Sequence, residues 1–151
     1  MHFINWTALA VLDFAPANDE NKPDLTKILV VPRDNRLGDQ GLKLIDKQTT
    51  FSENLQGLLL YSPTEVELPE GLHGKLDDID KDETIVVIVA MIAAERIMKA
   101  GGPEKVFGRD VMLVSPSSGP ETSWRDVNNG RITYSKGFVW YNAPDEAFLK
   151  V

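Results

Sequence analysis

The sequence predicts a β-rich α+β fold: a single domain with a central apolar strand, one main helix and a C-terminal hairpin. Residues 85–89 form an unbroken β-branched run, Ile-Val-Val-Ile-Val, which indicates a strand buried on both faces and therefore central in its sheet. Residues 91–100 change to helix-forming types and end at Gly101-Gly102-Pro103, the usual stop signals of a helix. Asn129-Gly130 stands between two strand-like segments and predicts a tight hairpin turn.

The other elements follow from local patterns in chain order. Residues 2–14 alternate imperfectly and predict a strand or a bent pair of strands. A short apolar strand is expected at 27–31, where Pro32 stops it, and a half-buried strand at 42–51. Further strands are expected at 57–61, 66–68, 111–114, 122–127 and 131–141. The polar, proline-rich segments between them read as surface loops rather than linkers, so residues 1–151 form one domain.

Composition excludes several classes of protein. No apolar run approaches the roughly 20 residues of a membrane span, and the N-terminus lacks the basic and cleavable segments of a secretory signal. The chain has no cysteine, which rules out disulfides and thiolate zinc sites and agrees with a cytoplasmic location. Its net charge of −7 disfavours nucleic acid as the main partner, because such binding needs a basic surface.

No motif predicts a metal, a cofactor or a catalytic group. The spacing Asp78-x-Asp80-x-Asp82 copies the start of a calcium loop, but Glu83 and Val89 stand where that loop needs its glycine and its glutamate. A solvated acidic loop is the preferred interpretation. The two histidines have no identifiable orienting partner, and serine-hydrolase, phosphate-loop and dinucleotide fingerprints are missing from the sequence. The sequence therefore argues against an enzyme without excluding one.

The best candidate for a ligand site follows the strand at 111–114. The loop Ser115-Pro-Ser-Ser-Gly-Pro120 offers N–H and O–H donors, and Arg125 adds a planar fork of charge-assisted donors beside Asp126. We predict an anion site formed by Ser115, Ser117, Ser118, Gly119, Arg125 and Asp126, joined by Asn5 and Thr7 from the first strand. The alternative is an ordinary surface connection with charges paired across a hairpin.

Large aromatic side chains gather near the C-terminus, in or beside the same hairpin. Core or subunit-interface packing is the preferred interpretation, and more apolar area lies there than a two-stranded ribbon hides. We therefore expect a homo-oligomer. The residues are Trp124, Tyr134, Phe138, Trp140 and Tyr141.

Short motifs follow one another along the chain in the order Ile4-Asn5-x-Thr7, Val31-Pro32, the segment from Ile85 to Glu95, Asp110-Val-x-x-x-Ser115-Pro-x-x-Gly-Pro120, Arg125-Asp126, Asn129-Gly-x-Ile132 and Gly137-Phe138. This order resembles a group of small phage and prophage proteins of unassigned function. Two departures matter: Ala8-Leu9 replaces a Pro-His pair, and Ser117-Ser118 replaces an Asp-Thr pair, which removes a carboxylate and favours phosphate. The resemblance implies a phage origin and a loop of shared purpose, but no activity.

The leading hypothesis is a phage-encoded binding protein of the host cytoplasm that sequesters a small anionic ligand, with a nucleotide signal of host defence as the first candidate. One alternative is an oligomeric phage structural or assembly protein. Another is a phosphoesterase-like enzyme acting on a nucleotide, with Glu95 or Asp126 as its base.

Overall fold

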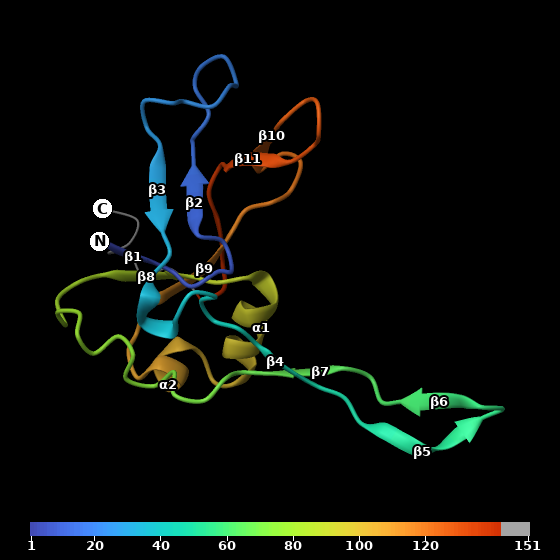
Figure 1. The fold of residues 1–151 in the computed structure, drawn as a ribbon. Coiled ribbons are helices and arrows are strands. Elements are labelled where there is room, and N and C mark those ends of the chain that lie inside the picture. Colours follow the sequence, from blue (N-terminus) through green and yellow to red (C-terminus); the bar gives the residue numbers. More distant parts are fainter. Residues whose placement is uncertain (143–151) are drawn as a thin grey trace.

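Two four-stranded sheets pack face to face, and two helices cover the outer face of the first sheet (Figure 1). The computed structural model describes residues 1–142 and, among these, every side chain except those of residues 51–55. The first sheet has the order β1 (His2–Asn5), β8 (Ile85–Ile88), β9 (Met112–Pro116), β12 (Phe138–Trp140). The second has the order β10 (Ser123–Arg125), β11 (Ile132–Ser135), β2 (Val11–Phe14), β3 (Leu29–Pro32). The helices are α1 (Met91–Lys99), α2 (Pro103–Phe107) and a 3₁₀ turn, Asn35–Leu37.

The apolar run predicted as a central strand is β8, which lies between β1 and β9 and runs parallel to both. All four of its residues are buried. Val87 belongs to the core on the helix side of the sheet, whereas Val86 and Ile88 face the second sheet. This alternation explains the unbroken β-branched sequence, because both faces of the strand are covered. The expected α+β class is confirmed.

Helix α1 starts three residues after β8 ends and packs its Ala93, Ala94 and Ile97 side chains on the sheet. The predicted main helix is therefore confirmed. It ends where Gly101 and Gly102 adopt positive φ angles of 111° and 95°, a conformation that side-chain-bearing residues rarely adopt. No helix within residues 1–142 has the length and apolar character needed to cross a bilayer.

The predicted strand at 131–141 is wrong in extent, because the chain changes sheets at Gly137. Residues before it form β11 of the second sheet, and residues after it form β12, which pairs with β9 of the first sheet. Phe138 then packs between the sheets, 4.5 Å from the ring of Phe14. Trp124 stays in the second sheet, where its indole N–H donates to the Ala15 carbonyl oxygen at 2.9 Å. The aromatic residues therefore do not share one hairpin.

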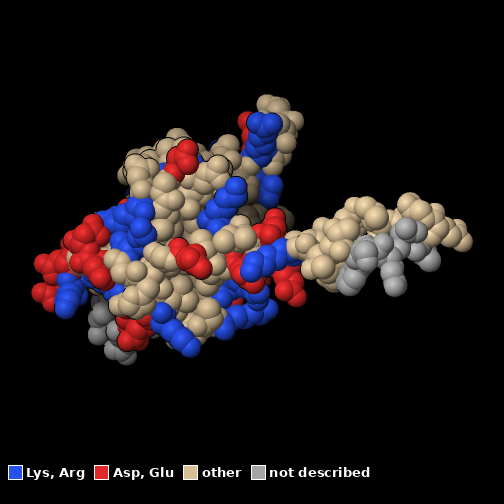
Figure 2. Space-filling model, turned by 60° about the horizontal axis from the view of Figure 1, so that its bottom comes forward, with Lys and Arg blue, Asp and Glu red and all other residues tan. Residues whose placement is uncertain are grey.

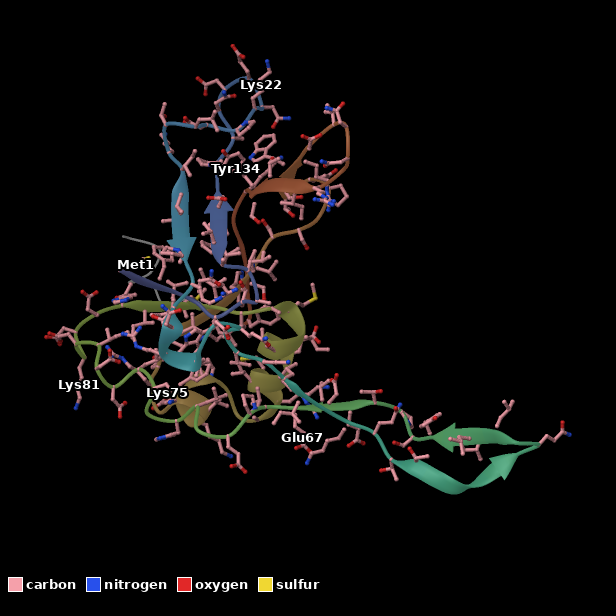
Figure 3. All side chains as sticks on the ribbon, in the orientation of Figure 1. Met1, Lys22, Glu67, Lys75, Lys81 and Tyr134 are labelled. Atoms are coloured by element: carbon pink, nitrogen blue, oxygen red, sulfur yellow. The ribbon has the colours of Figure 1, made fainter. Side chains whose placement is uncertain are left out.

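A long β-arm projects from this body (Figure 1). Its base is the pair β4 (Ile45–Lys47) and β7 (Glu65–Glu67), and its outer part is the hairpin β5 (Thr50–Leu55) and β6 (Leu58–Tyr61). Glu67 lies at the base (Figure 3), where its carboxylate pairs with Lys47 at 2.8 Å. The expected half-buried strand at 42–51 is wrong for β4, whose three residues are exposed because no layer covers the arm. The side chain of Phe51 lies outside the described residues.

The acidic loop between β7 and β8 folds around two arginines. The guanidinium of Arg109 donates to the carbonyl oxygens of Leu76, Ile79 and Asp80. Arg36 donates to Asp78 through two nitrogens, at 3.1 and 2.7 Å, and this hydrogen bonding holds the pKa of Asp78 below its ordinary value. No group of three or more acidic, histidine or cysteine side chains in the described part of the chain is arranged to hold a metal ion.

Candidate ligand-binding site

Three parallel strands end at the same edge of the first sheet. They are β1, β8 and β9, and the segments that follow them are the turn at residues 6–10, the start of α1 and the loop at 117–122. Ligands of sheets with parallel strands commonly bind outside this carboxyl edge. The segments following the three strands therefore define where a site is expected.

A pocket of about 450 Å³ lies at this edge, a size suited to a small molecule. The β1–β2 turn, the first residue of α1, the end of β9 and strand β11 line it. Its wall is largely apolar, with Leu9, Met91 and Ile132 contributing. Tyr134 lines it from β11 (Figure 3). Asp13 is the one carboxylate among the described lining residues.

Ser115 carries the least expected feature of the pocket. It follows Val114 in β9 and therefore shares a strand face with Leu113, on the side of the sheet where α1 packs. Its residue exposure is 3%, and its hydroxyl oxygen has no hydrogen-bond partner among the described residues. A buried hydroxyl without a partner costs about 1–3 kcal/mol. Because Ser115 lines the pocket, a bound water or ligand is the expected partner of this buried hydroxyl.

The N-terminus of α1 is the second polar feature. The N-cap residue, Ala90, provides no side-chain hydrogen bond. In the described part of the chain, the amide N–H groups of Met91, Ile92 and Ala93 have no acceptor. These orphan donors and the helix dipole together create a positive end that favours an anion. Ala90 and Met91 line the same pocket as Ser115.

Four of the residues predicted from the sequence line the pocket: Thr7, Ser115, Ser117 and Ser118. Asn5 does not line it; this residue is fully buried, and its amide nitrogen donates to the carbonyl oxygens of Leu9 and Val31 at 3.1 and 3.2 Å. Asn5 therefore shapes the β1–β2 turn instead of facing a ligand.

Within the serine-rich loop, most polar groups bind each other. The Ser117 hydroxyl donates to the Thr122 carbonyl oxygen at 2.6 Å and accepts from the Gly137 amide at 3.1 Å. The Gly119 carbonyl oxygen accepts from the Ser123 hydroxyl at 2.7 Å. Among the described residues of this segment, Ser115 therefore carries the buried side-chain polar atom that lacks a partner.

Arg125 and Asp126 do not line the pocket. Arg125 is exposed, and its guanidinium donates to the carbonyl oxygens of Ser118 and Gly130 at 2.8 and 3.0 Å, which clamps the loop to the hairpin turn. Asp126 accepts from the amides of Asn128 and Asn129 at 2.7 and 3.3 Å and so forms that turn. Both residues organise the segment beside the pocket.

Sequence reasoning missed the contribution of α1. The junction Val89-Ala90-Met91 was recognisable as a strand passing directly into a helix, and an alanine at the N-cap position leaves the helix uncapped. That combination was the available signal. Asp13 and Tyr134 come from the second sheet, and no local pattern places them beside Ser115.

No protein-family model, curated protein or solved structure matches this chain. The resemblance to phage proteins therefore stays a prediction.

Proposed function

We propose that this protein binds a small anionic ligand, with the anionic group seated between the N-terminus of α1 and the hydroxyl of Ser115. The observation that carries the proposal is that Ser115, whose buried hydroxyl has no partner among the described residues, and the uncapped N-terminus of α1 line one pocket. A phosphoryl group suits this seat because its several oxygens accept from backbone N–H and O–H donors together.

The rest of the pocket supports a ligand with an apolar or aromatic body. Leu9, Met91 and Ile132 provide apolar surface beside the anion seat, and Tyr134 adds an aromatic ring. The Asp13 carboxylate repels a second anion at that position and accepts hydrogen bonds from ligand N–H or O–H groups. A nucleotide combines these properties, since it joins a phosphate to a flat base and a hydroxylated sugar.

Substitutions at Ala90 test the anion seat, because Ala90 is exposed and a longer side chain fits there. An Ala90→Asp variant places a carboxylate on the orphan N–H groups. It should raise the stability of the protein by about 0.5–1 kcal/mol and yet abolish binding of inorganic phosphate or adenosine 5′-monophosphate. Ala90→Asn, which caps the helix without a charge, should bind more weakly than wild type and more tightly than Ala90→Asp.

Isothermal titration calorimetry measures the affinities, and thermal melting measures the stability. Opposite changes in stability and affinity separate a blocked site from a damaged fold. The proposal would be disproved if wild type bound neither anion at millimolar concentrations. It would also be disproved if Ala90→Asp bound the anions as wild type does.

The biological setting that we propose is sequestration of a nucleotide signal in the host cytoplasm by a phage-encoded protein. Its support is the resemblance in motif order, from Asn5 to Phe138. The phosphoesterase alternative has less support, because neither Glu95 nor Asp126 lines the pocket.

We also propose self-association through the arm, in line with the expected homo-oligomer. Residues 58–61, Leu-Leu-Leu-Tyr, are exposed by 71, 53, 45 and 56%. The described arm surface beyond its base carries no blue or red in Figure 2, so the described side chains of this ribbon are uncharged. An isolated two-stranded hairpin is marginally stable in water, and a partner would cover it. Sedimentation velocity of wild type and Leu60→Lys tests this, since the added charge should release monomers.

A further inference from the structure

Two buried side-chain polar atoms lack a hydrogen-bond partner among the described residues: the hydroxyl oxygen of Ser115 and the Nε of Arg33. They belong to neighbouring hollows. Arg33 lines a hollow of about 590 Å³ that adjoins the pocket of Ser115, and both hollows are lined by Thr7, Ala8 and Ala90. The two unpartnered groups therefore lie around one feature, the N-terminus of α1.

The side chains that line the second hollow carry a net positive charge, which favours a negatively charged ligand. Arg33 and Lys43 line it against one carboxylate, Asp39, although the whole chain carries a net charge of −7. Ile92 and Ala93, from the uncapped first turn of α1, line it too. The positive end of the helix thus faces both hollows.

The Arg33 side chain is held in place before any ligand arrives. One of its terminal nitrogens donates to the Ala8 carbonyl oxygen at 2.5 Å, and its backbone N–H donates to the Ala10 carbonyl oxygen at 2.8 Å. The bond to Ala8 uses a single donor of the guanidinium, and the Nε, which has no acceptor among the described residues, is buried from solvent. The terminal nitrogens are therefore the donors that can meet a ligand, and a guanidinium fixed in this way is suited to binding phosphate.

We propose that the hollow beside Arg33 and Lys43 is a second anion subsite, and that the ligand is a small molecule with two phosphoryl groups. One phosphoryl group lies at Ser115 and the helix N-terminus. The other lies against Arg33 and Lys43. This inference rests on the proposed function and narrows it to a doubly phosphorylated ligand whose body spans the residues shared by the two hollows.

The test compares adenosine 5′-monophosphate with adenosine 3′,5′-bisphosphate by calorimetry. Wild type should bind the bisphosphate at least about tenfold more tightly, because charge-assisted contacts to the second phosphoryl group are added. Arg33→Ala and Lys43→Ala should each remove most of that advantage and leave monophosphate affinity unchanged. Arg33→Lys should keep part of it, since the charge remains and the fork is lost.

Lys22→Ala is the matched control. Lys22 is an exposed lysine in the loop between β2 and β3, at the end of the molecule away from α1 (Figure 3), and its removal should leave both affinities unchanged. Arg33 also supports the β1–β2 turn, so thermal melting is used to check that Arg33→Ala is folded. If Arg33→Ala melts at a lower temperature than wild type, the affinities of Lys43→Ala decide the test.

Equal affinity of wild type for both nucleotides would overturn the inference. So would a bisphosphate advantage that survives in Lys43→Ala. In either case, monophosphate binding that is lost in Ala90→Asp would leave the proposed function standing. Monophosphate binding that is insensitive to Ala90→Asp would instead disprove the proposed function itself.

Discussion

The side-chain oxygen of Asn5 accepts two hydrogen bonds from Thr7, one from its amide at 2.9 Å and one from its hydroxyl at 2.7 Å. The Thr7 hydroxyl in turn accepts from the Leu9 amide at 3.2 Å. A buried amide at the end of β1 thus fixes the turn whose outer residues line both hollows. The geometry of the site depends on a residue that does not contact the site.

Replacing Asn5 should therefore damage the fold. Asn5→Ala removes four hydrogen bonds and leaves the buried carbonyl oxygen of Val31 without its side-chain donor. We expect the free energy of unfolding to fall by about 2–4 kcal/mol, measured by urea denaturation. Asn35→Ala, at an exposed position without a side-chain hydrogen bond among the described residues, should change it little. Equal stability of the two variants would contradict this role.

Gly41 approaches the same turn from the next segment of chain. Its φ is +64°, and an added Cβ would lie 2.5 Å from the carbonyl oxygens of Thr7 and Trp6. Gly41→Ala should cost about 3 kcal/mol or more and weaken phosphate binding, because the backbone of the turn must shift. Gly71→Ala is the control, since Gly71 has a φ of +80° with nothing within 4 Å. Melting curves that shift equally would show that strain in φ, rather than the close approach, limits both sites.

The fold was predictable from the sequence where a residue pattern is compatible with only one kind of structure. Residues 85–89 had to be covered on both faces, and the glycines after residue 100 had to end a helix. The arm was not predictable in this way. Its leucines at 58–60 predict a strand, but apolar residues in sequence do not reveal that no second layer covers that strand.

The pair of Arg36 and Asp78 should make stability depend on pH at the acidic end. The hydrogen bond from Arg36 lowers the pKa of Asp78 in the folded protein. A lowered carboxyl pKa gives stability that is present above the unfolded value of about 3.9 and is lost as the pH falls through the folded value. Wild type should therefore melt slightly above Asp78→Asn at neutral pH, and the two curves should converge in stronger acid.

The effect should be small because the Asp78 side chain is 64% exposed. Asp19→Asn, which removes the same charge at an exposed position, is the control. A difference between wild type and Asp78→Asn that persists below the folded pKa would show that the amide disturbs the loop for a reason other than charge.

Arg125 should act on loop order more than on ligand affinity. Arg125→Ala removes the clamp between the carbonyl oxygens of Ser118 and Gly130. Hydrogen exchange of the amides in residues 117–119 and 126–131 should become faster, because local opening no longer breaks these two bonds. Phosphate affinity should fall far less than in Ala90→Asp. An equal fall would mean that Arg125 reaches the ligand.

The site was only partly predictable for a related reason. A strand ending in hydroxyl residues indicated Ser115 and its neighbours, since local sequence determines them. Arg125 is close in sequence to the serine-rich loop, but its guanidinium donates to backbone carbonyl oxygens. Arg33 is distant in sequence from that loop and lines the hollow beside the N-terminus of α1. Which arginine meets a ligand depends on how the two sheets bring loops together, and residue spacing does not encode that.

Excising the arm tests whether it serves folding or assembly. Replacing residues 48–64 by Asn-Gly would join Lys47 to Glu65, which already pair in the antiparallel base, through a two-residue hairpin turn. The melting temperature should change little, because the side chains of β6 are exposed and contribute nothing to either core. Phosphate affinity should also stay as in wild type.

The oligomeric state should change, however. Sedimentation velocity should show an association in wild type that the shortened protein lacks, since the exposed segment 58–61 is gone. Association that persists after excision would assign the contact to another surface, such as β12, where Val139 and Trp140 are 45 and 56% exposed. A large loss of stability would instead show that the arm packs on the body in solution, and its exposed leucines would then need no partner chain.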